Sequence, residues 1–422
     1  MAEDQRARRL DRAIDAVVAF AMVSLAWLAV FGHRGAAVVA AIMALAIASR
    51  PEIWREGLTL LAPRRVRLQP LPRAAVAMML FTLWIALSAL WSPTPGAPKL
   101  ALTIGVFTLC GGALVYEASR ATPARVRRMA QLFAGAVGSA SLALLFEGLT
   151  GGLLRDLVPP TDQSLLRWKD MTALARGVTL VTPLVFPACA LLFMLTGSRL
   201  VAAVPPVAAV IAASQFSVAA NVVALLFGGA AFAAAMIRPK SSVIALCALF
   251  MATLFAAPLL AFAPAQAVIG AGDPVMPPSW AQRLYLYQAA GDRILGECLP
   301  FGCGADYARA WAAEGALIEV PGSPIPLQEA PTHPHNVFLQ IWLELGLVGV
   351  LTIAAALWFG LQRIVAIAPN RLAFAALAAA GAACYISFIF EASLWQAWRI
   401  AVIALAAFGG ALSYSFNGRR CT

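Results

Sequence analysis

Long runs of apolar residues, each close to the length of a membrane span, recur along this chain of 422 residues. A helix of about 20 apolar residues crosses the hydrocarbon core of a bilayer, whereas the strands of a membrane β-barrel alternate apolar and polar positions. The runs here are continuous, so the pattern predicts transmembrane helices. The predicted spans are residues 13–31, 35–49, 74–91, 98–118, 129–148, 171–195, 200–213, 219–237, 241–263, 337–361, 372–394 and 399–416. The second and seventh are short, and Pro205 and Pro206 are expected to kink the seventh.

The basic residues between these runs predict the orientation of the chain. With the N-terminus in the cytoplasm, most of the 31 Lys and Arg residues fall in short cytoplasmic loops, as the positive-inside rule requires. One missed or surplus span would invert every later loop, so the agreement supports an even number of spans and a cytoplasmic C-terminus. Composition agrees, because 61% of the residues are hydrophobic and only 12% are charged. The net charge of +11 then reflects topology and does not indicate nucleic-acid binding.

One long polar segment separates the ninth and tenth predicted spans. We expect Ser279 to cap a helix over residues 280–295, and Asp306 to cap a second short helix. The predicted fold is an all-α integral membrane protein of about twelve transmembrane helices, with a mostly helical polar segment on the outer side. The predicted division is residues 1–263 for helices one to nine, 264–336 for the polar segment and 337–422 for helices ten to twelve.

A minority of the basic residues are predicted on the outer side or within spans, against the orienting rule. They are Arg34, Lys99, Arg155, Arg167, Lys169, Arg176, Arg283, Arg293, Arg309 and Arg399. An Arg at the centre of an apolar span costs about 2.5–3.5 kcal/mol on insertion scales, so it usually has a partner or a function. Most of this group lies either in the outer loop 149–170 with the helix that follows it, or in the polar segment.

Two of the three histidines, His333 and His335, lie where the polar segment meets the tenth span. His335-Asn336 is followed by nine residues and then by the sequence GLVG (346–349). This H-[N/S/Q]-x9-G-x-x-G pattern at the outer end of a late span resembles the O-antigen ligase family. That family belongs to a superfamily with the O-antigen polymerases and the protein O-oligosaccharyltransferases. Further similar features are the single long polar segment, Arg283 followed by the turn LPFGCG (299–304), and the pair Arg176-Gly177.

The resemblance implies a metal-independent, inverting glycosyltransferase with a GT-C-like helix bundle in the bacterial inner membrane. Such an enzyme would move O-antigen glycan from undecaprenyl diphosphate to a sugar hydroxyl of lipid A–core at the periplasmic face, without a cofactor. The expected partners are these two substrates and membrane lipids, with no nucleic acid.

The chemistry of that transfer also suits the residue types. A diphosphate leaving group activates the anomeric carbon, so the reaction needs cations on the diphosphate and a base for the attacking hydroxyl. Arg binds phosphate oxygens through a planar fork, and His accepts a proton near neutral pH. We therefore predict His335 as the base, with Arg176 and Arg283 as the leading cations. The predicted substrate-binding residues are Asn336, Arg155, Arg167, Lys169, Arg293, His333 and Glu391.

Several of these residues also have a purely structural interpretation. His335 and Asn336 could simply cap the tenth span, and Arg176 could extend to the membrane interface. Gly346 and Gly349 are expected to allow close helix packing rather than to touch substrate.

The roles of two acids and the oxidation state of two cysteines are also predicted, with alternatives for some of them. Glu391 either orients the base or pairs with Arg399, and Glu344 is expected to make a helix–helix contact. Cys298 and Cys303 either form a disulfide in an oxidising compartment or remain free thiols.

Other functions are weighed against this hypothesis. An O-antigen polymerase or a protein O-oligosaccharyltransferase would share the motif, although the protein-modifying members tend to be longer. A lipid-linked glycan transporter would have charged residues through the membrane midplane and internal repeat symmetry. The sequence has no repeat, and its polar residues gather at the outer face, which favours catalysis there. No P-loop, G-x-S-x-G or H-E-x-x-H motif is present either.

Overall fold

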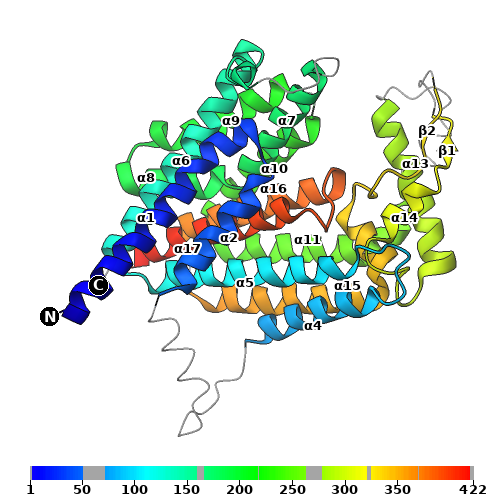
Figure 1. The fold of residues 1–422 in the computed structure, drawn as a ribbon, viewed down its shortest axis with the longest axis horizontal. Helices are drawn as coiled ribbons and strands as arrows, with labels where there is room; N and C mark the ends of the chain where they lie inside the picture. The colour runs from blue at the N-terminus through cyan, green and yellow to red at the C-terminus, as the bar shows by residue number, and fades with distance from the viewer. Residues whose placement is uncertain are drawn as a thin grey trace, which may run out of the picture.

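The fold is a bundle of helices with the polar segment at one end and both termini at the other (Figure 1). The computed structural model describes residues 2–50, 72–158, 166–216, 218–262, 278–320, 325–368 and 370–418. The bundle helices are α1 (Ala2–Phe31), α2 (Gly35–Ala48), α4 (Arg73–Ser88), α5 (Pro98–Arg120), α6 (Pro123–Thr150), α7 (Leu166–Val181), α8 (Val185–Thr196), α9 (Arg199–Gln215), α10 (Ala219–Ile237), α11 (Pro239–Leu260), α15 (Val337–Ala366), α16 (Arg371–Phe390) and α17 (Ala397–Gly418).

Every predicted span falls on a helix or a helix pair, which confirms an all-α, multi-pass membrane protein. Eight of the described helices are long and apolar enough to cross a membrane, or nine if α7 and α8 count as one span bent by 53°. Helices α2, α4 and α9 are apolar but shorter, so the number twelve stays a prediction. The break between α7 and α8 contains Pro183, whereas Pro205 and Pro206 lie inside the continuous helix α9.

Small residues let the bundle helices approach closely. Helix α16 packs against α10 through a buried face made largely of alanine. A Cβ atom on Gly228 of α10 would lie 3.1 Å from the carbonyl oxygen of Ala379 and 2.4 Å from the ring of Phe186. Backbones packed this closely are typical of membrane helices, which have no hydrophobic driving force between them.

The polar segment forms a small folded unit over one end of the bundle (Figure 1). Its elements are α13 (Pro278–Arg293), a π-helical turn (Ile294–Cys298), α14 (Tyr307–Ala313) and the antiparallel strands β1 (Leu317–Ile318) and β2 (Leu327–Gln328). The two predicted helices are therefore present, and Cys298 and Cys303 form a disulfide.

The two predicted helix caps are wrong. Ser279 lies inside α13, which begins one residue earlier. Asp306 does precede α14, but it has a φ of +62° and its side chain caps nothing. The Asp306 carboxylate instead accepts a hydrogen bond from Arg309 at 2.9 Å.

Helix α15 is broken at Gly346, where φ is +61° and ψ is −161°. The turn 299–304 lies against this break. Cys303 N–H donates to the carbonyl of Leu343 at 2.8 Å, and Leu347 N–H donates to the carbonyl of Pro300 at 2.8 Å. A Cβ atom on Gly346 would lie 2.3 Å from the Pro300 oxygen. The glycine is therefore needed for contact with a turn, which corrects the expected helix packing.

We expect Gly346→Ala to destabilise the protein, because alanine would need a positive φ and would overlap the turn. The strain alone should cost about 1–3 kcal/mol, measured as a lower midpoint of thermal unfolding in detergent. Gly360→Ala is the matched control on the same helix, since a Cβ atom there meets nothing within 4 Å. Equal unfolding midpoints for the two variants would contradict the role given to Gly346.

Candidate active site

His335 lies in the loop that enters α15, and its side chain takes no part in capping that helix. The cap is Asn336, whose Oδ1 accepts from the N–H groups of Phe338 and Leu339 at 3.0 and 3.1 Å. His335 itself has a φ of +53°, and its N–H donates to Nδ1 of His333 at 3.1 Å. Because Asn336 satisfies the helix end alone, the His335 ring is available for other chemistry.

The two histidine rings form a pair with their centroids 4.2 Å apart. Nδ1 of His335 is buried and has no hydrogen-bond partner among the described residues. Burial lowers the pKa of His335 to about 4, helped by the charges of Arg283 and Arg399 and opposed by a hydrogen bond with the Glu391 backbone. Burial likewise lowers the pKa of His333 to about 3. Both rings are therefore neutral at pH 7. The Nδ1 lone pair of His333 accepts the His335 N–H, whereas Nδ1 of His335 can accept a proton.

Arg399 is a buried cation that is linked to this pair through Glu391. It is 8% exposed, and its Nη2 lies 3.2 Å from Oε1 of Glu391, while Nη1 donates to Ser387 at 2.6 Å. Of the two alternatives for the Glu391 side chain, the structure shows the ion pair with Arg399, and the hydrogen bond with His335 comes from the Glu391 backbone. Arg399 was not among the predicted site residues, although an arginine inside the last span was the available signal.

The two leading arginines approach from different elements. Arg283 is half-buried on α13, and its charge acts on both His333 and His335. Arg176 is exposed on α7, and its charge acts on Arg399 and on His33 instead. In the described part of the chain neither arginine has an acidic partner within 4 Å, so both positive charges are uncompensated.

The third histidine, His33, was missed by the sequence analysis. It lies in the turn between α1 and α2, is 9% exposed, and contacts Trp398 edge-on with centroids 4.9 Å apart. Burial lowers its pKa to about 4, with further lowering by Arg176, Arg34, Arg399 and Arg155. Histidine beside arginine in a predicted outer turn was a signal that could have found it.

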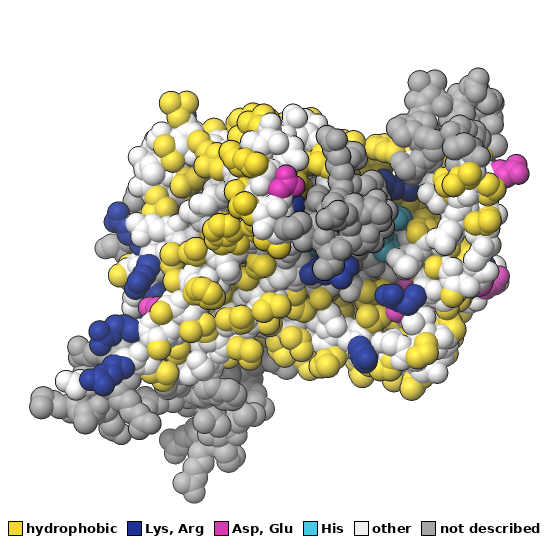
Figure 2. All heavy atoms as spheres, turned by 45° about the horizontal axis from the view of Figure 1, so that its top comes forward, with side chains coloured by type: hydrophobic (Ala, Val, Ile, Leu, Met, Phe, Trp, Pro, Cys, Tyr) yellow, Lys and Arg dark blue, Asp and Glu magenta, His cyan; other side chains and the backbone are white. Residues whose placement is uncertain are grey.

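The pair Arg176-Gly177 explains how α7 reaches that turn. A Cβ atom on Gly177 would lie 1.9 Å from the carbonyl oxygen of Ala29, so only glycine lets α7 rest on the end of α1. Arg176 is thereby held beside the turn of His33. Histidine side chains are visible in Figure 2 in a hollow with Lys and Arg side chains nearby.

The remaining predicted cations have other contacts or lie outside the described side chains. Arg155 donates to the carbonyls of Val30 and Phe31 at 3.1 and 3.0 Å, at the end of α1. Arg293 donates to Tyr307 and Glu314 and lies over the ring of Trp311, within the polar segment. These contacts do not bring Arg293 to the histidine pair. Arg167 and Lys169 belong to α7, but their side chains lie outside the described residues.

Glu344 is a further buried acid whose contacts the sequence did not predict. Its carboxylate is fully buried and accepts from the N–H of Asp306 at 2.6 Å, from Gln340 at 3.0 Å and from the indole of Trp395. The expected helix–helix contact is thus a junction between α15, the polar segment and the loop before α17. Gln340 extends it by accepting from Leu394 N–H at 2.9 Å.

An apolar cavity of about 540 Å³ lies between α4, α5, α11, α15, α16 and α17. Among its described lining residues the only polar side chains are Thr108, Ser393 and Arg399. Val337, two residues after His335, also lines it. The cavity therefore extends from membrane-facing apolar side chains to a cation beside the histidine loop.

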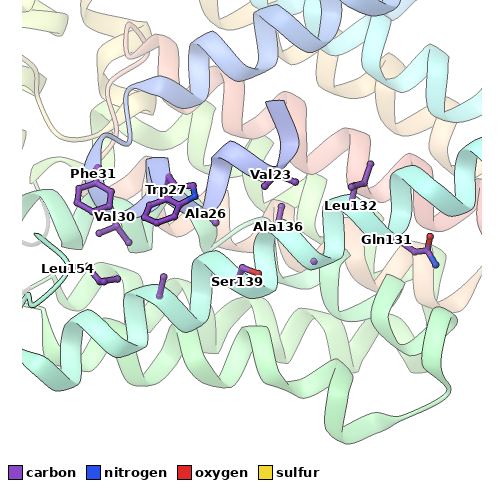
Figure 3. Close-up of a pocket in the computed structure, with 12 residues that line it drawn as sticks. Val23, Ala26, Trp27, Val30, Phe31, Gln131, Leu132, Ala136, Ser139 and Leu154 are labelled. Carbon is purple, nitrogen blue, oxygen red and sulfur yellow. The ribbon is translucent and has the colours of Figure 1, made fainter. Parts of the chain in front are cut away.

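A second cleft, of about 430 Å³, lies between α1 and α6. Figure 3 shows Trp27 and Val23 of α1 on one side of this cleft and Ser139 and Ala136 of α6 on the other. No charged side chain is among its described lining residues. This cleft therefore lacks the cation that the larger cavity has.

The histidine pKa values predict that acid destabilises the fold. All three folded-state values lie below the ordinary value of 6.5, so the unfolded chain binds more protons. Stability should be constant above about pH 6.5 and fall as the pH decreases toward 4. The midpoint of thermal unfolding in detergent at pH 7 and pH 5 measures this. A double variant, His333→Gln with His335→Gln, should show a smaller fall, and an unchanged fall would contradict the assignment.

Comparison with known proteins gives partial matches. No protein-family model matches the chain. A Rickettsia prowazekii protein named as a candidate polysaccharide ligase is 28% identical over 129 residues, and a Rickettsia felis protein of the same name is 30% identical over 132 residues. Each match covers 29% of this chain, and 30% of the length of either relative. The similarity is thus to part of two proteins that carry the name of polysaccharide ligases.

Proposed function

We propose that the chain is a glycosyltransferase of the O-antigen ligase type, acting at the periplasmic face of a bacterial inner membrane. It would transfer O-antigen glycan from undecaprenyl diphosphate to a sugar hydroxyl of lipid A–core. The observation that carries this proposal is the apolar cavity that ends at Arg399 beside the histidine loop. The partial similarity to proteins named as polysaccharide ligases agrees with it.

The cavity suits a substrate that is apolar along its chain and anionic at its head. Apolar side chains of six helices would enclose a polyprenyl chain entering from the bilayer. At its polar end, Arg399 would meet the diphosphate, whose oxygens match the fork of a guanidinium. Arg283 and Arg176 have no acidic partner in the described part of the structure, so a diphosphate would supply the missing negative charge.

The proposed reaction is a single displacement with inversion. The acceptor hydroxyl oxygen forms a bond to the anomeric carbon as the bond from that carbon to the diphosphate oxygen breaks, and the electron pair leaves on the diphosphate. His335 accepts the hydroxyl proton. Its ring is neutral and Nδ1 is unoccupied by any described partner, as this role requires. A bound diphosphate would offset the charges of Arg283 and Arg399, and so raise the pKa of His335 toward a more effective value.

An in-line displacement at the anomeric carbon suggests different positions for the arginines around the sugar. The leaving group must depart from the face of the sugar opposite the attacking hydroxyl, so the diphosphate lies beyond the sugar from His335. Arg399 is linked to both histidine groups: it lies over the ring of Trp398, which contacts His33, and it pairs with Glu391, whose backbone is hydrogen-bonded with His335. We therefore place the diphosphate on the side of Arg399 that faces Arg176 and His33, with Arg283 approaching from α13.

His335→Gln should lower kcat by about 10²–10⁴, the usual contribution of a positioned base. His335→Ala should abolish transfer, and Arg283→Ala and Arg176→Ala should both be severe. Arg309→Ala is the control and should be mild, because Arg309 is 59% exposed and paired with Asp306. The assay is glycan transfer from undecaprenyl diphosphate to lipid A–core by the purified protein, and activity should persist in excess chelator.

Normal transfer by His335→Ala would remove that residue from the mechanism. Loss of activity in chelator would revive a metal-dependent reaction. Growth of a second lipid-linked glycan without transfer to lipid A–core would instead identify a polymerase.

Filling the apolar cavity should weaken binding of the lipid donor. Gly112 lines the cavity and a Cβ atom there meets nothing within 4 Å, so Gly112→Leu should fold and occupy the space. We expect a higher KM for the donor with kcat nearly unchanged. Gly135→Leu is the control, because Gly135 has the same open space but lines the cleft between α1 and α6. Equal donor KM values for the two variants would refute the cavity as the donor site.

A further inference from the structure

A third cleft, of about 410 Å³, lies away from the histidines, where the end of α4 meets the turn 299–304. Its aromatic lining is Trp84, Trp91 and Phe301, and its charged lining residue is Glu297. The ring of Trp84 lies 5.6 Å from that of Trp91 and 6.2 Å from that of Phe301, measured between centroids. Three aromatic rings and one carboxylate therefore share one open cleft.

The indole groups are held with their polar edges toward the protein. Trp84 Nε1 donates to the carbonyl of Leu345 at 2.8 Å, and Trp91 Nε1 donates to the carbonyl of Gly302 at 3.0 Å. A tryptophan of the membrane interface usually directs its N–H toward water or lipid headgroups. Here both indole N–H groups donate to backbone carbonyls of the protein, unlike the tryptophans of an ordinary interfacial belt.

The wall that carries Phe301 is fixed before any ligand arrives. The disulfide of Cys298 and Cys303 closes the turn, and Gly304 N–H donates to the carbonyl of Glu344 at 3.0 Å. Phe301 is nevertheless 57% exposed. A rigid turn that presents an exposed aromatic side chain loses little entropy on binding, as a preformed site should.

The negative charge of Glu297 limits which ligands this cleft can bind. Glu297 is exposed and has no ion pair or hydrogen bond among the described residues. Its carboxylate would repel the phosphates of lipid headgroups. A ligand for this cleft must offer apolar faces to the rings and hydrogen-bond donors to the carboxylate. A pyranose ring does both, with C–H groups on its faces and hydroxyl groups at its edge.

We propose that Trp84, Trp91, Phe301 and Glu297 form a carbohydrate-binding subsite. It would hold a sugar ring of the glycan other than the one that reacts, because Leu345 lies about 12 Å along α15 from Val337 and the histidine loop. The identification of the glycan as a substrate rests on the proposed function. Binding of a sugar to this cleft requires no transfer and is tested without it.

The experiment measures binding of a soluble glycan to the full chain in lipid nanodiscs by saturation-transfer NMR. The probes are core oligosaccharide and O-antigen polysaccharide released from lipopolysaccharide by mild acid, with no lipid-linked donor present. The wild type should bind at least one probe. Phe301→Leu should weaken binding about tenfold, because it keeps an apolar side chain but loses the aromatic face, and Phe301→Trp should retain it. Glu297→Gln should weaken binding severalfold.

Leu295→Ala is the matched control, since Leu295 is exposed in the same turn region but does not line the cleft. Equal unfolding midpoints for all variants exclude misfolding as the cause. Failure of the wild type to bind either probe, or equal binding by the wild type and Phe301→Leu, would overturn the subsite. If the wild type binds phosphocholine but no glycan, and Glu297→Gln abolishes that binding, the cleft binds a cationic ligand and the sugar subsite is refuted. The probes carry no diphosphate and no transfer takes place, so failure of the transfer mechanism would leave this result intact.

Discussion

A buried arginine that must be compensated inside a membrane protein is the constraint on which the site depends. Placing an Arg in the apolar interior costs about 2.5–3.5 kcal/mol on insertion scales, and removing its partner from a buried pair costs about 3–5 kcal/mol. Arg399 meets this constraint with Glu391 and Ser387, which draws the loop before α17 over the end of α16. The same loop places the Glu391 backbone beside His335. One electrostatic requirement thereby sets the position of both the cation and the proposed base.

In the part of the chain that the structure describes, the charge of Arg399 is compensated by an acid, whereas the charges of two other arginines near the site are not. Glu391 pairs with Arg399, but Arg283 and Arg176 have no acidic neighbour in the described residues. Three histidines nearby stay neutral because burial and these cations disfavour their charged forms. A site with this balance attracts an anion and keeps its bases unprotonated at the same time. Both properties suit a reaction in which a hydroxyl is deprotonated while a phosphate leaves.

The sequence predicted the helical class, because that class follows from local patterns of apolar residues, whereas the location of the site stays a prediction. Apolar runs predicted the helices, and His335, Arg283 and Arg176 stood out as polar residues against them. His33 and the contacts of Glu344 were missed, since they depend on helices that meet only in three dimensions. The same limit explains Ser279 and Asp306, whose capping patterns were plausible locally but are replaced by the first turn of α13 and by a left-handed backbone.

The break at Gly346 gives a physical meaning to the spacing between the histidine and the glycines. Backbone hydrogen bonds to the turn 299–304 fix one end of the short helix that begins at Val337, and the contact of His335 with Glu391 fixes the other. The number of residues between these two ends therefore sets both the distance and the rotation from one end of the helix to the other. One inserted residue would advance the helix by about 1.5 Å and rotate it by about 100°, so that base and turn could no longer both be in place. This geometry therefore constrains the number of residues between His335 and Gly346.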